Sequence, residues 1–324
     1  MLSVENLQFK YSPEVAVLKN IHFKINSTER TCILGESGSG KSTLLKLIYG
    51  ILEPDAGQIF FNGDLIKGPK QQLIPGHEDM KYVAQDFDLS LYMTVAENVG
   101  KHLSNIYQER KKQRVAEILE VLSLSEFAHR RPVELSGGQQ QRVAIARTLA
   151  KMPKMLILDE PFSHLDAALH IKIRQQLIQY CEEQNMGVLF SSHRADDALG
   201  YADRLIIMKK GEILQIGTPQ DIYLAPKNLY VAELFGKVNH WEAHDCDTLQ
   251  IPNPTGELCL SYLHELKITP HGIPMQVKHS RFIGRGYEIS LEANGTQAVC
   301  YAETPYTQGE TLGVSVQNYR FVKG

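Results

Sequence analysis

The stretch GESGSGKST, residues 35–43, has the residue types and spacing of a phosphate-binding loop. The part from Gly35 to Ser42 fits the pattern G-x-x-x-x-G-K-[ST]. Glycines let successive backbone N–H groups turn inward around phosphate oxygens, and a following helix adds the positive end of its dipole. Lys41 would reach the β- and γ-phosphates of a nucleotide, and Ser42 would offer its hydroxyl to Mg²⁺. The predicted loop consists of Gly35, Glu36, Ser37, Gly38, Ser39, Gly40, Lys41, Ser42 and Thr43.

An apolar run ends in two carboxylates in MLILDEP, residues 155–161. Strands that end in acidic residues at a turn are common, and alone this pattern would indicate only structure. With a phosphate loop in the same chain, Asp159 is the best candidate to hold Mg²⁺ through its water shell. Glu160 is then placed to orient the attacking water or to accept its proton.

A second glycine-rich stretch, LSGGQ, occupies residues 135–139. Ser136 stands where a helix N-cap is expected, and a run of good helix formers follows. Gly137 and Gly138 would expose backbone N–H groups to an anion. The chain therefore carries two predicted anion sites about a hundred residues apart, although one is enough to bind a phosphate.

Strands and helices alternate around these motifs. Early strands are predicted over 2–9 and 21–25, and a strand over 30–35 leads into the phosphate loop and a helix. Such alternation implies a largely parallel sheet covered on both faces. The later predicted elements are helices over 108–124, 141–151 and 167–184 and strands over 154–161, 187–193 and 204–211.

The pattern changes near residue 236. A polar, turn-rich stretch is followed by short alternating segments separated by Gly, Asn and Pro, with no long helical pattern. We therefore predict an α/β domain over 1–236 and a small all-β, barrel-like domain over 237–324.

Composition narrows the classes of protein. The net charge of -3 gives no basic excess of the kind that nucleic-acid-binding proteins show. The five cysteines have no CxxC spacing and are odd in number, which favours a reducing compartment. No signal-peptide pattern and no run of about 18 apolar residues is present, so we expect neither export nor a membrane span.

Over residues 1–235, these motifs in this order resemble the ATP-binding subunits of ATP-binding cassette (ABC) transporters. The resemblance implies a P-loop ATPase domain with a helical subdomain, which uses ATP and Mg²⁺. It also implies that the LSGGQ stretch closes over ATP held by a second copy, so that two copies sandwich two ATP molecules. The residues that it assigns to this contact are Ser136, Gly137, Gly138 and Gln139.

Four further positions match motifs of that family. Tyr11 matches the aromatic residue that stacks on adenine, although it is also an ordinary strand-end tyrosine. Gln85 matches the glutamine that approaches Mg²⁺ and the attacking water and links the site to the membrane partner; the plain alternative is a surface glutamine. Asp166 matches the aspartate at the dimer seam. His193 matches the histidine that contacts the γ-phosphate and aligns Glu160, whereas a lone histidine after a strand is usually structural.

Two positions depart from the family pattern. Arg194 stands where an acidic residue usually follows the histidine, and Ala84 stands where an aromatic residue often precedes the glutamine. Neither change removes a chemical group from the implied mechanism.

The tail and the segment 211–236 resemble those of importer ATPases, whose C-terminal domain is oligonucleotide-binding-like and regulatory. The resemblance implies an ATPase at the cytoplasmic face of the cell membrane that drives separate permease subunits, and through them an extracytoplasmic binding protein. We expect residues 86–100 to dock on the permease, and we favour ferric iron or a polyamine as the cargo over sulfate and sugars.

Three rival functions belong to other classes. A soluble ABC ATPase acting on nucleic acid or ribosomes usually has two cassettes or a long coiled coil, and this chain shows neither. A non-hydrolysing ATP clamp would not need Asp159, Glu160 and His193 together. An exporter ATPase is disfavoured by the separate chain and the β-rich tail.

Overall fold

The computed structural model describes residues 1–12, 15–84, 86–162 and 167–323. Its contacts divide the chain into two compact units, Met1–Pro219 and Gln220–Gly324. The sequence placed the boundary at residue 236, so the contacts group α7 (Leu229–Glu233) and most of α6 (Pro219–Leu224) with the second unit. The division into domains at residue 236 stays a prediction.

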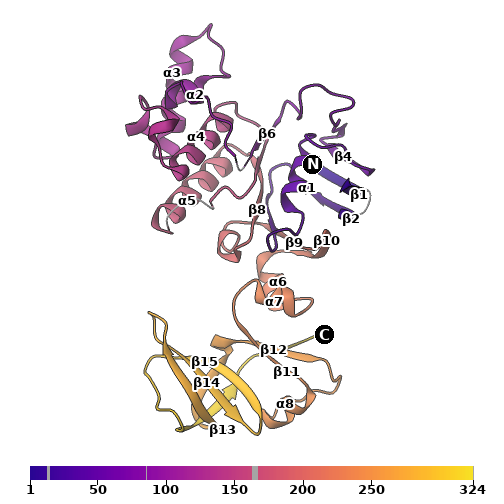
Figure 1. Ribbon diagram of the computed structural model, residues 1–324, viewed down its shortest axis with the longest axis vertical. Coiled ribbons are helices and arrows are strands. Elements are labelled where there is room, and N and C mark those ends of the chain that lie inside the picture. Colours follow the sequence, from indigo (N-terminus) through magenta and orange to yellow (C-terminus); the bar gives the residue numbers. More distant parts are fainter. Residues whose placement is uncertain (13–14, 85, 163–166, 324) are drawn as a thin grey trace. The chain divides into compact units, whose positions relative to one another are not determined.

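A six-stranded sheet forms the centre of the first unit (Figure 1), in the order β10-β9-β3-β8-β7-β6. Neighbouring strands are parallel except for β10 against β9, which confirms the predicted, largely parallel sheet. All residues of β7 and β8 are buried, as expected for strands covered on both faces. The strands are β3 (Arg30–Leu34), β6 (Met80–Val83), β7 (Met155–Leu158), β8 (Gly187–Ser192), β9 (Arg204–Lys209) and β10 (Glu212–Gly217).

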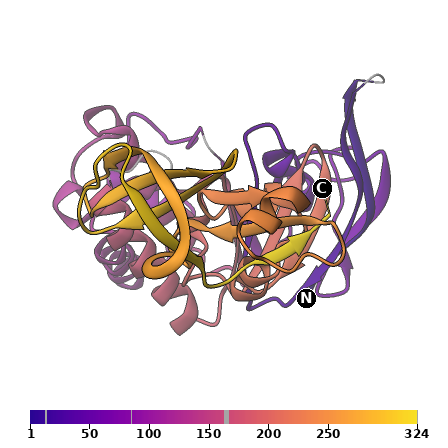
Figure 2. The same cartoon turned by 90° about the horizontal axis from the view of Figure 1, so that it is seen from below.

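A separate antiparallel sheet, in the order β2-β1-β4-β5, completes the N-terminal part. Its strands are β1 (Leu2–Ser12), β2 (Val15–Ile25), β4 (Ala56–Phe61) and β5 (Asp64–Leu65). β1 and β2 form a long hairpin, drawn in indigo in Figure 2. Side chains of this sheet, of β3 and of helix α1 (Lys41–Ile48) share one buried core. This core fixes the start of α1 against the end of β3.

Helices form a second group within the first unit. They are α2 (Val95–Gly100), α3 (Gln108–Val121), α4 (Gly137–Leu149) and α5 (Ala167–Glu183), with short 3-10 turns η1 (Ser125–Phe127), η2 (Pro132–Glu134) and η3 (Ala195–Asp197). Helix α3 contacts α2, α4 and α5, and α2 also contacts α4. Figure 1 shows this group apart from α1 and the β1–β2 hairpin. In the described parts of the chain, no helix is long and apolar enough to cross a membrane.

The second unit has two antiparallel sheets (Figure 2, orange to yellow), in the orders β11-β12-β17 and β15-β14-β13-β16. The sheets contain β11 (Val238–Trp241), β12 (Leu258–Tyr262), β13 (Leu266–Phe282), β14 (Tyr287–Ala293), β15 (Thr296–Ala302), β16 (Thr311–Val316) and β17 (Arg320–Val322). The expectation of an all-β tail is wrong in one detail, because helix α8 (Ala243–Thr248) and the turn η4 (Leu263–Glu265) are also present. α8 lies in the stretch that we interpreted as turn-rich. Six residues are too few to show a helical period. Trp241, just before α8, and Cys246, within it, nevertheless lie in the core of the second unit.

A buried ion pair holds the C-terminal strand of the second unit. The Arg320 guanidinium donates two hydrogen bonds to the Glu265 carboxylate, at 2.9 and 2.6 Å, and lies 4.7 Å from the centre of the Tyr262 ring. The Glu265 side chain is only 6% exposed. The pair therefore joins β17 to the turn η4 that follows β12, and removal of one partner would leave the other charge buried without compensation.

We expect Arg320→Ala to lower the free energy of unfolding of the second unit by about 3–5 kcal/mol, because the Glu265 carboxylate would stay buried without its cation. Urea titration followed by the fluorescence of Trp241, the single tryptophan, measures this change. Lys278→Ala is the control, since Lys278 and its partner Glu292 are 39% and 36% exposed, and this change should cost less than about 1 kcal/mol. Equal losses in the two variants would contradict the assignment.

Candidate functional site

The predicted phosphate loop runs from the end of β3 to the start of α1. A Cβ atom at Gly35 would lie 2.3 Å from the carbonyl oxygen of Met208, so only glycine fits beside β9. Gly40 is the N-cap of α1 with φ 101°, a left-handed conformation that glycine adopts without strain. The loop therefore opens into a helix N-terminus, as the motif requires.

The side chain of Lys41 forms hydrogen bonds to the backbone of this loop. Its Nζ donates hydrogen bonds to the carbonyl oxygens of Gly35 and Glu36, both at 2.8 Å, and the residue is 4% exposed. Burial lowers the pKa of Lys41, and the carboxylates of Glu160 and Asp159 act in the opposite direction. An ammonium has three donors, so one remains for an anion after these two hydrogen bonds.

The carboxylate of Asp159 is buried next to the loop and accepts hydrogen bonds from three hydroxyl groups. Ser42 and Ser191 donate to its Oδ1, at 2.9 and 2.7 Å, and Tyr82 donates to its Oδ2 at 3.3 Å. The donors come from α1, β8 and β6, so the strand edge and the loop meet at this side chain. The predicted neighbourhood of Ser42 and Asp159 is confirmed.

Glu160 follows in a left-handed backbone conformation, with φ 47°. Its N–H donates to Ser191 Oγ at 2.9 Å, and its carbonyl oxygen accepts a hydrogen bond from Gln141 Nε2 of α4 at 2.9 Å. A non-glycine residue in this region costs about 1–2 kcal/mol, which is typical of functional sites that fix a side chain. The Glu160 Oε2 atom lies 3.6 Å from Nδ1 of His193, so the structure brings these two predicted residues together.

Side-chain hydrogen bonds fix the turn that follows His193. Ser192 Oγ accepts the N–H of Arg194 at 3.0 Å and itself hydrogen-bonds the buried carboxylate of Asp197, which pairs with Arg174 at 3.2 Å. The Arg194 side chain is 56% exposed, 3.8 Å from Asp196. The arginine that replaces the usual acidic residue therefore pairs with a neighbouring surface carboxylate.

Tyr11 lies at the end of β1, beside the start of α1. Its hydroxyl is 3.2 Å from Thr43 Oγ1, its ring contacts Phe9 edge-on at 4.8 Å, and the residue is 62% exposed. An exposed ring at the edge of the loop can take a flat base, but its role stays a prediction. Gln85 and Asp166 lie outside the described residues, and the predictions about them stay open.

The LSGGQ stretch forms the N-terminus of α4. Ser136 is its N-cap: the side chain accepts the N–H of Gln139 at 3.3 Å, and Ser136 N–H donates to Gln139 Oε1 at 2.8 Å. The predicted N-cap is therefore confirmed. Ser136 and Gly137 are exposed, Gly138 is buried, and a Cβ atom at Gly137 would meet nothing within 4 Å. The helix thus presents an open N-terminus within the helical group.

Two residues of this site escaped the sequence analysis. Ser191 lies two positions before His193, and a serine in a buried strand carries no functional pattern of its own. Tyr82 lies three positions before Gln85 and belongs to no motif that the sequence analysis used. Burial, with the charge of Asp159, raises the pKa of Tyr82, so its hydroxyl stays protonated and can donate to that carboxylate.

Comparison with known proteins identifies the family of the chain. The ABC transporter family matches residues 18–163. A spermidine/putrescine import ATP-binding protein, PotA of Roseobacter denitrificans, is 38% identical over 270 residues, 83% of this chain and 72% of that protein. The chain belongs to the ABC transporter family.

Other members of the family are equally similar. The sulfate/thiosulfate import ATP-binding protein CysA of Thermosynechococcus vestitus is 35% identical over 90% of this chain and 86% of its own length. The Fe(3+) ions import ATP-binding protein FbpC 1 of Rhodococcus jostii is 42% identical over 70% of this chain and 65% of its own length. A dimeric post-hydrolysis structure of the cassette MJ0796, bound to ADP and Pi, superimposes with a TM-score of 0.61 at 32% identity, over 68% of this chain and 99% of that one.

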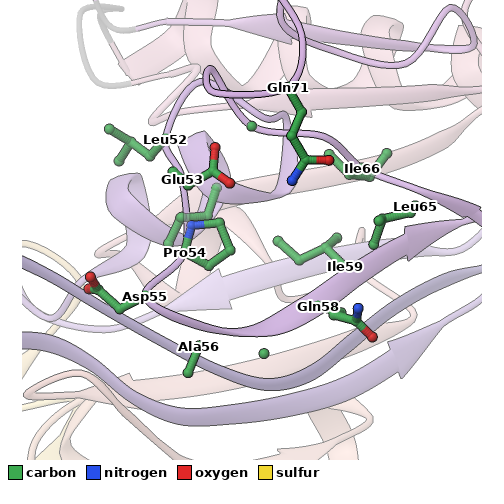
Figure 3. A pocket seen from close by; sticks show the side chains of 13 residues that line it. Leu52, Glu53, Pro54, Asp55, Ala56, Gln58, Ile59, Leu65, Ile66 and Gln71 are labelled. Carbon is green, nitrogen blue, oxygen red and sulfur yellow. The ribbon is translucent and has the colours of Figure 1, made fainter.

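A further pocket of this cassette lies between the end of α1 and strands β4 and β5 (Figure 3). Glu53 there accepts the N–H of Lys70 at 3.2 Å, and Asp55 accepts the N–H of Lys10 at 2.7 Å. Both carboxylates therefore take part in the packing of loops around this pocket.

Ser191→Ala should lower kcat for ATP hydrolysis about ten- to hundredfold, because a hydrogen bond to a charged group contributes roughly 1.5–3 kcal/mol and about 1.4 kcal/mol is a tenfold change. Steady-state phosphate release measures this rate. Thr31→Val is the matched control, since the buried Thr31 hydroxyl on the adjacent strand β3 has no partner in the described residues. An unchanged rate in Ser191→Ala would show that the hydroxyl does not hold Asp159 and Glu160.

Proposed function

We propose that this chain hydrolyses Mg·ATP between two copies of itself and that the closure and opening of the pair drive separate membrane subunits of an importer. The observation that carries the proposal is the cluster at the strand edge, where Asp159 meets Ser42 and where Glu160 lies against His193. This cluster supplies a metal-binding carboxylate and a candidate general base beside one phosphate loop.

The loop fits a triphosphate. The buried Ser39 hydroxyl has no hydrogen-bond partner among the described residues, and a Cβ atom at Gly38 would meet open space. Lys41 provides a positive charge at the start of α1. A phosphate group would satisfy the orphaned hydroxyl and the remaining ammonium donor together.

The carboxylate cluster fits Mg²⁺. Ser42 and Asp159 offer a hydroxyl and a carboxylate oxygen, which are the ligand types that Mg²⁺ prefers. When bound, Mg²⁺ neutralises charge on the β- and γ-phosphates. Ser191 and Tyr82 keep the Asp159 carboxylate oriented, because each donates a hydroxyl hydrogen to it.

Glu160 is the group that takes the proton in this mechanism. Its backbone is fixed by Ser191 and Gln141, and its carboxylate faces the imidazole of His193. Glu160 orients the water and accepts a proton from it, while His193 holds the carboxylate in place and contacts the γ-phosphate. The attack is thus prepared by positioning, which is the main protein contribution to phosphoryl transfer.

The second copy would supply the anion site of the LSGGQ stretch. The open N-terminus of α4 supports this role, because exposed backbone N–H groups and the helix dipole favour negative charge. The triphosphate attracts this N-terminus, and hydrolysis removes part of the charge, so the pair opens. Ser136, Gly137, Gly138 and Gln139 thereby complete the site of the partner copy, with Asp166 at the seam.

The permease contact is assigned to residues 86–100, on the cytoplasmic face of the membrane. Leu91 and Tyr92 in this segment are exposed, and Asn98 fixes the loop around them by donating to the carbonyl oxygens of Ser90, Met93 and Thr94. A rigid loop with exposed apolar side chains suits a docking surface. Gln85, directly before it, would report the state of the nucleotide to the permease.

For the cargo we retain ferric iron or a polyamine, delivered by an extracytoplasmic binding protein through the permease. A polyamine and an Fe(3+) import protein are among the relatives, but a sulfate import protein is similar to the same degree. The regulatory role that the family resemblance implies is proposed for the second unit, whose sheets have a core of their own.

Glu160→Gln should abolish turnover while ATP-bound dimers accumulate, because the amide keeps the shape of the side chain but cannot accept the proton. Phosphate release measures turnover, and size-exclusion chromatography with light scattering measures the dimer. The same variant with ADP is the control and should stay monomeric. Undiminished hydrolysis would remove Glu160 from its role as the base.

Two inactive variants should complement each other if each site is built from two copies. Lys41→Ala destroys the phosphate loop of one chain, and Ser136→Arg blocks the second anion site of the other. An equal mixture should recover about a quarter of the wild-type rate, because about half of the dimers are mixed and each holds one intact site of two. A mixture as inactive as its components would contradict the shared site.

A further inference from the structure

We propose that Arg147 is a positioning residue that fixes the chain just after Gln85 to helix α4, so that the two move as one body. The guanidinium lies in the last turn of α4. Nη1 donates to the carbonyl oxygen of Asp88 at 2.6 Å, and Nη2 donates to that of Phe87 at 3.2 Å. The inference rests on the proposed function, since it concerns how nucleotide-linked movement reaches the docking segment.

The carbonyl groups that Arg147 binds belong to strained residues. Phe87 has φ 61° and Asp88 has φ 43°, two consecutive left-handed conformations in residues other than glycine. Bulky side chains rarely adopt this region, and the surrounding structure must hold them there. Hydrogen bonds from Phe87 N to Ala84 O and from Asp88 N to Asp86 O close the turn locally. Arg147 ties this turn to a helix.

The ion pair between Arg147 and Asp88 contributes less to this contact than the two hydrogen bonds to carbonyl oxygens. The Asp88 carboxylate is 3.8 Å from the guanidinium and is 95% exposed, so solvent screens the ion pair. The Arg147 side chain is only 14% exposed, and its planar fork matches two adjacent carbonyl oxygens. A lysine at this position would offer a single point charge and could not hold both carbonyl groups in the same way.

The position of Arg147 on α4 gives the contact its consequence. Ser136 caps one end of this helix, and Arg147 lies near the other end, about 16 Å away at 1.5 Å per residue. A displacement of the LSGGQ end is therefore passed to Phe87 and Asp88 at the start of the docking segment, and from there to the rest of that segment. Without Arg147, the helix could move while that segment stayed behind.

Hydrogen exchange of the nucleotide-free full chain tests the contact directly. In Arg147→Ala, we expect residues 86–94 to exchange about tenfold faster than in the wild type, because the strained turn loses its charge-assisted hydrogen bonds. Arg114→Ala is the matched control. Arg114 is also 14% exposed and donates to the carbonyl oxygens of Leu149 and Ala150 at the same end of α4, but this contact does not involve the turn. Equal acceleration in both variants, or in neither, would overturn the proposal.

A second pair of variants tests the strained backbone without touching α4. Asp88→Pro fixes φ near −65° and should accelerate exchange of 86–94 as much as Arg147→Ala does, with no further effect in the double variant. Asp88→Gly tolerates φ 43° and should leave exchange much closer to the wild type. Additive effects of Arg147→Ala and Asp88→Pro would show that the two act separately, against the proposal.

The nucleotide response separates this proposal from the proposed function. In a Glu160→Gln chain, ATP should slow exchange in 136–146 and in 86–94 together. Addition of Arg147→Ala should preserve the response of 136–146 and abolish that of 86–94. An undiminished response of 86–94 would overturn the role of Arg147. If ATP changes no exchange in 136–146 in the Glu160→Gln chain itself, that result would count against the ATP sandwich. The comparison of the nucleotide-free chains would still test the role of Arg147.

Discussion

The site depends on the burial of one carboxylate. Asp159 is 3% exposed, and an ionised carboxylate without partners in such a place would cost several kcal/mol. Hydroxyl groups from α1, β6 and β8 provide the missing partners. Because these donors belong to three different elements, the carboxylate also sets how the strand edge meets the phosphate loop. The stability of this region and the chemistry of the site therefore depend on the same hydrogen bonds to Asp159.

Helix α4 connects the parts that respond to nucleotide in the proposed function. Its capped N-terminus is exposed, Gln141 in its second turn holds the carbonyl oxygen of Glu160, and Arg147 in its last turn holds the turn at Phe87 and Asp88. The helix thus contacts two strained stretches of backbone, one at Glu160 and one at Phe87 and Asp88 at the start of the docking segment. Strained conformations persist only where surrounding contacts hold them. A shift of α4 would change both at once.

The sequence predicted the parts of the site that carry a local pattern. The loop from Gly35 to Ser42 and the N-cap at Ser136 could be found because their function needs particular residues at fixed spacing along the chain. Ser191, Tyr82 and Arg147 could not be found this way. Their partners lie far away in sequence, and only the packing of strands and helices brings them together. The same limit applied to α8, whose six residues are too short for a periodic signal.

The geometry of the α4 N-terminus also explains why the proposed closure should depend on the full charge of the nucleotide. A helix N-terminus has four unpaired N–H groups and carries roughly half an elementary charge. The side chain of Ser136 already takes one of these groups, from Gln139. The attraction left for an anion is therefore modest, and two such contacts per dimer must act together. In the proposed cycle, one triphosphate at each site would hold each N-terminus, whereas a diphosphate with a departing phosphate would leave each N-terminus with less charge to bind and would let the pair open.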